Sequence, residues 1–194
     1  MRINTEKIKD LGPCKVRLDN YLKHYPDFDG SLEDFIMLKE LTYDDKVWVF
    51  VRIATPEQNV RWSLLCASKV LSIFEENCPG DKRPRQALES VKAWLNSPTK
   101  ENAYAVLAAA YDARAASDAA TAYAARAAAY AAVYAALAAY DAAVYAARDA
   151  YAASNAAVYA ARDAAYAASD AADYARENEE HVNLLMMVDA LWGA

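Results

Sequence analysis

The sequence predicts an all-α protein, a multi-helix bundle whose C-terminal half is antiparallel, helical and rich in alanine and tyrosine. Residues 101–180 are about half alanine and contain neither glycine nor proline, and alanine has the highest intrinsic helix propensity. Before this stretch, the chain repeats a helix-start signal in which Ser or Thr stands three residues before an acid or amide residue. The run 48–53 is β-branched and aromatic and could form a strand, but no partner strand is evident, so a helix is favoured.

The first hundred residues predict a series of short helices separated by marked turns. In chain order the expected helices are 4–11, 14–24, 31–41, 42–51, 56–77 and 84–95. The clearest start is at Thr55, where Thr serves as the N-cap, Pro56 takes the first helical position and Gln58 completes a capping box. Thr99 provides a similar cap for the alanine-rich region.

The alanine-rich region has an internal repeat. The segment 144–149 (Val-Tyr-Ala-Ala-Arg-Asp) returns at 158–163, two heptads later. A shorter Tyr-x-x-Arg unit occurs at Tyr111/Arg114, Tyr123/Arg126, Tyr145/Arg148 and Tyr159/Arg162. Residues three apart are neighbours on a helix, so each guanidinium can lie along the ring of its tyrosine.

A path of steps of three or four residues from Ala125 to Ala175 meets only alanine. Such a seam would let helix axes approach near the short end of the roughly 8–10 Å range. Two interpretations of the tyrosines opposite it are open. The rings fill gaps between helices while Arg and Asp form a solvated face, or Tyr, Arg and Asp together form a recognition surface.

A single helix over residues 101–180 would be roughly 120 Å long, so we expect the region to fold back on itself. Plausible breaks are Ser117-Asp118, Ser154-Asn155 and Ser169-Asp170, because these residue types favour N-caps. Two to four antiparallel helices are therefore expected; the alternative is one long helix in a coiled-coil assembly.

The expected domain organisation is an N-terminal helical region, 1–98, and an alanine-rich helical region, 99–194, packed on it; the alternative is one continuous domain. The apolar segment near the C-terminus, 182–192, is expected to dock on the N-terminal core, with an oligomer contact as the alternative.

The charge balance bears on the partner. The net charge is −6, and residues 101–180 carry five arginines against eleven acids. This balance disfavours nucleic acid as a ligand for this half, because binding it requires neutralisation of phosphates. The three cysteines lack CxxC spacing and predict reduced thiols in a cytoplasmic protein. No hydrophobic run is expected to reach the length of a membrane span, and no signal peptide is evident.

The sequence predicts no enzyme, no cofactor and no metal site. Neither His24 nor His181 has a partner at metal-ligand spacing. The chain has four glycines in total and none of the common nucleophile-elbow or phosphate-loop motifs.

One segment carries a more specific pattern. A helix ending in Phe74-Glu-Glu is followed by the turn Asp81-Lys-Arg83-Pro-Arg85 and by a helix that ends near Trp94. Together with the long alanine-rich tail, this pattern resembles the putative immunity protein family of bacterial toxin systems and phages.

The resemblance covers roughly residues 45–180. It implies an all-helical, non-enzymatic protein that neutralises a toxin or a defence component by stoichiometric binding, as an immunity protein or a phage anti-defence inhibitor. The rival hypothesis is a structural scaffold, a homo-oligomer that self-assembles through alanine seams and tyrosine faces.

Two groups of residues are candidates for contacting a partner. They are Tyr123, Arg126, Tyr145, Arg148, Tyr159 and Arg162 of the repeat, and Asp81, Arg83 and Arg85 of the turn. The turn also has a purely structural interpretation. Asp81 can accept hydrogen bonds from backbone amides at the start of the 84–95 helix, and the two arginines can pair with Glu75, Glu76 or Glu89.

Overall fold

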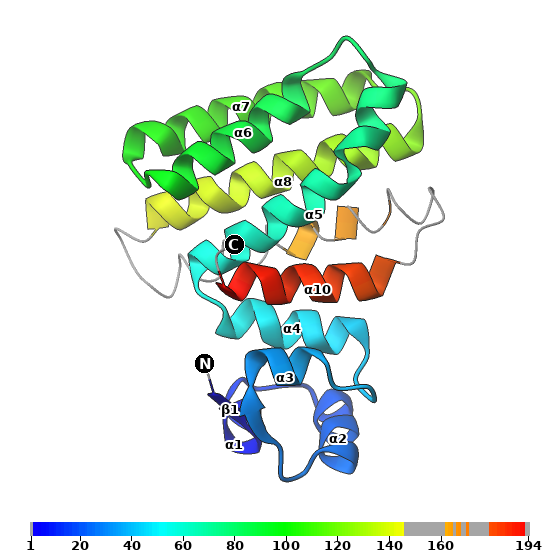
Figure 1. Ribbon diagram of the computed structural model, residues 1–194, viewed down its shortest axis with the longest axis vertical. Helices are drawn as coiled ribbons and strands as arrows, with labels where there is room; N and C mark the ends of the chain where they lie inside the picture. The colour runs from blue at the N-terminus through cyan, green and yellow to red at the C-terminus, as the bar shows by residue number, and fades with distance from the viewer. Residues whose placement is uncertain (1, 146–161, 165, 168–169, 171–178, 193–194) are drawn as a thin grey trace. The chain divides into compact units, whose positions relative to one another are not determined.

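The computed structural model describes residues 2–145, 162–164, 166–167, 170 and 179–192 (Figure 1). Helices dominate the described residues, which confirms the all-α class. Contacts within the chain group it into two compact units, Met1–Ile53 and Ala54–Ala194. The boundary predicted at residue 98 falls inside the second of these units, and the helices on the two sides of residue 98 pack against each other.

The first unit combines short helices with one pair of strands. Its elements are β1 (Arg2–Asn4), α1 (Thr5–Asp10), α2 (Lys15–His24), β2 (Asp29–Ser31), α3 (Leu32–Ile36) and α4 (Tyr43–Ile53). The run 48–53 is helical, as predicted. The expectation that the chain has no strand pair is wrong for β1 and β2, which pair antiparallel with Ile3 opposite Gly30. Ile3 is fully buried, and Arg2 spans the pair to Asp29 at 2.6 and 2.8 Å.

Helix α3 is shorter than the predicted helix 31–41. It begins as expected, with Ser31 and Asp34 forming a capping box. It ends at Ile36, and the backbone of Glu40 is instead held by side chains of the α2 region. The Glu40 amide donates to the Tyr25 hydroxyl (3.1 Å), and its carbonyl accepts from Asn20 (3.5 Å).

The second unit is built from longer helices. They are α5 (Pro56–Asn77), α6 (Arg83–Asn96), α7 (Lys100–Ala119), α8 (Tyr123–Tyr145) and α10 (Glu179–Trp192). The predicted capping box is present, since the Thr55 amide donates to Gln58 Oε1 at 2.8 Å and the Gln58 amide donates to Thr55 Oγ1 at 3.2 Å. Helix α8 packs against α5, α6 and α7, and it is therefore the central helix of this unit (Figure 1).

The alanine seam lies on a buried side of α8. The first five positions of the predicted path are each 0 % exposed: Ala125, Ala128, Ala132, Ala136 and Ala139. Alanines of α7, among them Ala110 and Ala113, are also buried. Most later positions of the path lie outside the described residues. Over its described first part, the seam is confirmed as a helix-packing surface.

The chain folds back between α7 and α8, close to the predicted break at Ser117-Asp118. The Ser117 hydroxyl donates to the carbonyl of Arg126 (3.1 Å), and the Tyr130 hydroxyl donates to Asp118 (3.1 Å), so both residues link the two helices. The alternative of one continuous helix is therefore wrong for this part of the region. The break proposed at Ser154-Asn155 lies outside the described residues, as does Ser169.

Helix α10 packs on α5, as expected for docking on the N-terminal region. The Gln58 amide group donates to the carbonyl of Leu191 (3.2 Å), and Met187 is fully buried. Trp192, in contrast, is 74 % exposed.

One described helical stretch, Ala125–Val144, is long and apolar enough to cross a membrane, with a mean hydropathy of 1.4. The expectation that no run reaches this length is wrong, because the modest apolarity of alanine accumulates over 20 residues. About 61 % of the most apolar window is buried inside the protein. Core helices pass the same test, so the composition is weak evidence for a membrane span.

The close packing of α8 can be tested by enlarging one seam residue. We expect Ala139→Leu to destabilise the protein by roughly 1–3 kcal/mol, because extra methylene groups overpack a filled contact. The measurement is the free energy of unfolding from urea denaturation. Ala115→Leu on the exposed side of α7 is the matched control and should be nearly neutral. Equal stability of the two variants would contradict close packing at the seam.

Candidate partner-binding groove

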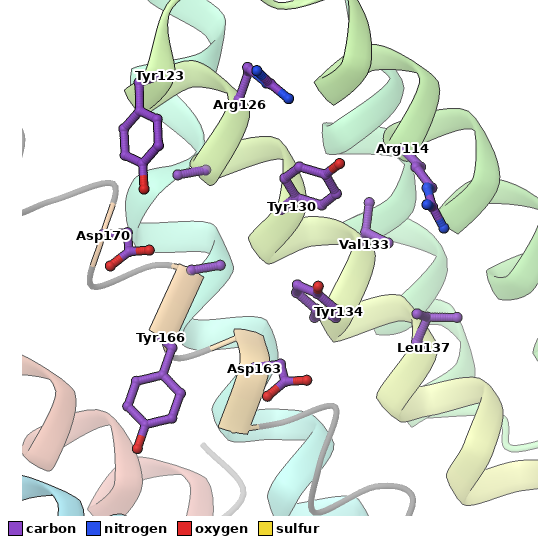
Figure 2. A pocket seen from close by; sticks show the side chains of 12 residues that line it. Arg114, Tyr123, Arg126, Tyr130, Val133, Tyr134, Leu137, Asp163, Tyr166 and Asp170 are labelled. Atoms are coloured by element: carbon purple, nitrogen blue, oxygen red, sulfur yellow. The ribbon is translucent and has the colours of Figure 1, made fainter.

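A groove of about 600 Å³ lies on the outer side of α8, opposite the alanine seam (Figure 2). Its floor consists of α8 residues at helical spacing: Ala127, Tyr130, Val133, Tyr134 and Leu137. Because steps of three and four return to one helix face, these residues form a single stripe. We call this site the α8 groove.

Two tyrosines dominate the floor. The rings of Tyr130 and Tyr134 stack with their centroids 6.2 Å apart and an interplanar angle of 27°. Both side chains are half-buried. The stacked rings give the floor a broad aromatic surface that remains open on one side.

Other tyrosines of the region are more exposed than the gap-filling interpretation predicts. Tyr104, Tyr111 and Tyr123 are 61, 63 and 58 % exposed, respectively. That interpretation is wrong for these three residues, because alanine supplies most of the helix contacts in this part of the chain. Tyr123 lies at one end of the α8 groove.

The two arginines of the groove are Arg114 from α7 and Arg126 from α8. Both are exposed, and within the described part of the chain neither guanidinium has a hydrogen-bond or ion-pair partner. Figure 2 shows Arg126 pointing away from Tyr123 rather than along its ring. The Tyr-x-x-Arg unit therefore does not form the expected ring contact at this position.

Carboxylates lie on the other side of the α8 tyrosines in Figure 2. They are Asp163 and Asp170, which line the groove together with Tyr166 and Ala167. Arg162, one of the predicted site residues, donates to Asp163 at 3.1 and 3.3 Å. Arg162 therefore lies beside the groove. The other predicted residues of the repeat, Arg148 and Tyr159, and the side chain of Tyr145 lie outside the described residues.

The predicted turn residues hold one another in place. The Arg83 amide donates to Asp81 Oδ1 at 3.0 Å, and the Arg83 guanidinium contacts both oxygens of the same carboxylate. Arg85 donates two hydrogen bonds to Glu75, one from Nε to Oε1 at 2.6 Å and one from a terminal guanidinium nitrogen to Oε2. The structural role of Asp81 and the pairing of Arg85 with Glu75 are thus confirmed. Arg83 pairs with Asp81 rather than with any of the expected glutamates.

These pairs change the acidity of the carboxyl groups. The hydrogen bonds from Arg85 lower the pKa of Glu75, and those from Arg83 lower the pKa of Asp81. A binding role for the turn arginines stays a prediction, and a partner would have to compete with the intrachain carboxylates.

Of the residues that line the α8 groove, only Tyr123 and Arg126 were among the predicted candidates. The missed residues include Arg114 of α7, the α8 side chains Tyr130, Tyr134 and Leu137, and the carboxylates Asp163 and Asp170. For the α8 side chains the signal was the spacing of four and three residues opposite the alanine seam, visible in the sequence but not distinguishable there from a buried face. Among the described residues, no group of three or more His, Cys, Asp or Glu side chains is placed to hold a metal ion.

The contribution of the Arg85–Glu75 pair to the stability of the protein should depend on pH. Since the folded pKa of Glu75 is lowered, its contribution to stability is present above the unfolded pKa of about 4.3 and is lost as the pH falls through the folded value. We expect Glu75→Gln to cost up to about 1 kcal/mol at pH 7, the range of exposed ion pairs. Near pH 3 the difference from the unchanged protein should shrink.

Urea denaturation at both pH values provides the measurement. The control is Glu76→Gln at the exposed neighbouring position, which should leave stability unchanged at either pH. A loss that is equally large at pH 7 and pH 3 would show that Glu75 acts through packing and not through its charge.

The comparisons with known proteins give one match. The model of the Imm-5 like putative immunity protein family matches residues 53–149. The comparisons with curated proteins and with solved structures found no match. The matched range contains α5, α6, α7 and α8, and therefore both the turn and the floor of the α8 groove.

Proposed function

The chain belongs to the Imm-5 like putative immunity protein family, and on this premise we propose that it is a non-enzymatic inhibitor that neutralises a protein target by stoichiometric binding. The family match is the observation that carries the proposal. The target would be a toxin or a component of a defence system. The corresponding biological setting is a bacterial toxin system or a phage or prophage that must protect itself in the cytoplasm.

The exposed side chains of the second unit support a binding role. Tyrosine and arginine are the residue types enriched at interface hot spots, and both line the α8 groove. Tyrosine offers a large contact area with few rotatable bonds, and arginine can pair with carboxylates through two hydrogen bonds. A stoichiometric inhibitor needs such a surface and no catalytic group.

The scaffold hypothesis is less well supported. It requires alanine seams that are available to other copies, but the described seam of α8 is already buried against helices of the same chain. Only the tyrosine-bearing faces remain for self-assembly through the described part.

The proposed function predicts one partner and a defined stoichiometry. Affinity purification of the tagged full chain from its native host, followed by mass spectrometry, should recover one abundant foreign protein. Expression of that protein alone should arrest growth, and co-expression of the chain should restore it. Calorimetric titration should then show saturation at a fixed molar ratio.

Two results would contradict this proposal. Recovery of the chain alone, with larger assemblies in size-exclusion chromatography, would favour the scaffold. Neutralisation of many target molecules by one copy of the chain would indicate catalysis in place of stoichiometric binding.

A further inference from the structure

We propose that the α8 groove is the site that binds the target, and that its occupant is a helix of the target whose apolar face lies between an acidic edge and a basic edge. This inference rests on the proposed function and adds the location and the chemistry of the contact. It depends on three properties of the described residues: the shape of the floor, the lack of described partners for Arg114 and Arg126, and the position of the carboxylates.

The floor is straight because it is the surface of one helix. From Tyr123 at its end to Leu137, the α8 groove is roughly 21 Å long, because a helix rises about 1.5 Å per residue. The tyrosine and leucine side chains project from it (Figure 2), and the small residues Ala127 and Ala167 also line the groove. Side chains that project from one helix face suit a second helix, whose side-chain ridges can pack between them.

An extended peptide fits the groove less well. Such peptides gain affinity by adding a strand to an open sheet edge. The helices α7 and α8, which contribute most of the described lining, form their backbone hydrogen bonds within each helix, so they offer no strand edge. Recognition must therefore proceed through side chains, as in the packing of an amphipathic helix into an apolar groove.

The charges of the groove define the edges of the occupant. Arg114 and Arg126 have no partner among the described residues, and each can pair with a carboxylate of an incoming protein. Asp163 and Asp170 lie seven residues apart on the other side of the tyrosines. Asp163 is already paired with Arg162, so Asp170 is the carboxylate that would attract a basic edge of the occupant. These carboxylates would repel the phosphates of a nucleic acid, which disfavours that class of ligand.

Site-specific photo-crosslinking tests the location. The full chain carries p-benzoylphenylalanine in place of Tyr134, and a matched control carries it in place of Tyr111, which is exposed on α7 but does not line the groove. Both are irradiated with the target obtained by affinity purification. We expect the Tyr134 position to cross-link to one helical segment of the target and the Tyr111 position to give little or no product.

A synthetic peptide of the cross-linked segment then tests the chemistry. We expect Arg126→Glu and Asp170→Lys each to weaken its binding by at least about tenfold, because like charges would face each other across the contact. Asp112→Lys, an exposed charge reversal outside the groove, should leave binding unchanged. Reversing the peptide's acidic residue should restore binding to Arg126→Glu, which a merely structural effect of this substitution would not do.

Several outcomes overturn the proposal. Cross-linking to a second copy of the chain would make the groove a homo-oligomer contact, and a target segment without the two charged edges would refute the chemistry. Neutralisation of the target together with cross-linking from Tyr111 alone would exclude the groove and leave the proposed function intact. Failure of the unchanged chain to neutralise any target would remove both proposals.

Discussion

The packing of α8 through alanine is the interaction on which the second unit depends. Because alanine has no side chain beyond Cβ, the backbones of neighbouring helices can approach closely, and dispersion between them supplies much of the cohesion. Buried alanines occupy several sides of α8, from Ala125 to Ala142, and three other helices pack against it. The buried positions of α8 are therefore filled mostly by alanine and not by large rings.

This constraint explains where the aromatic residues are. In most small proteins large apolar side chains occupy the core, and in the first unit they do, with Phe35 and Phe50 almost fully buried. In the second unit Trp62 and Phe74 are fully buried as well, but the buried positions of α8 itself are mostly alanine, and Tyr104, Tyr111 and Tyr123 lie largely in solvent. The tyrosine hydroxyl makes this exposure tolerable, because it retains hydrogen bonds with water. On α7 and α8 the exposed tyrosines thus accompany helix contacts that are made mostly by alanine.

The parts of the fold that the sequence predicts correctly are those set by local interactions. The capping box at Thr55 and Gln58 and the turn at Asp81 involve residues within a few positions of one another. The misplaced features depend on contacts between distant segments. β1 and β2 pair across 27 residues, and α3 ends early where residues of the α2 region bind the Glu40 backbone.

The candidate site shows the same division. The alanine seam and the Tyr-x-x-Arg repeat are visible as spacing, so Tyr123 and Arg126 could be selected from the sequence. Whether Tyr130 and Tyr134 point into the core or into solvent depends on which sides of α8 other helices cover. That choice follows from the arrangement of α5, α6 and α7 around α8, which a repeat of near-identical heptads does not specify.

An alanine core also affects how the exposed face can bind. Alanine has no rotamers, so the contacts that hold α8 cannot be relaxed by repacking side chains, and an altered position of the helix would open gaps instead. The stacked rings of Tyr130 and Tyr134 therefore project from a helix whose position is closely defined. A surface that is ordered before binding loses less conformational entropy when a partner arrives. If the proposed interface forms, Tyr130 and Tyr134 would therefore enter it already ordered.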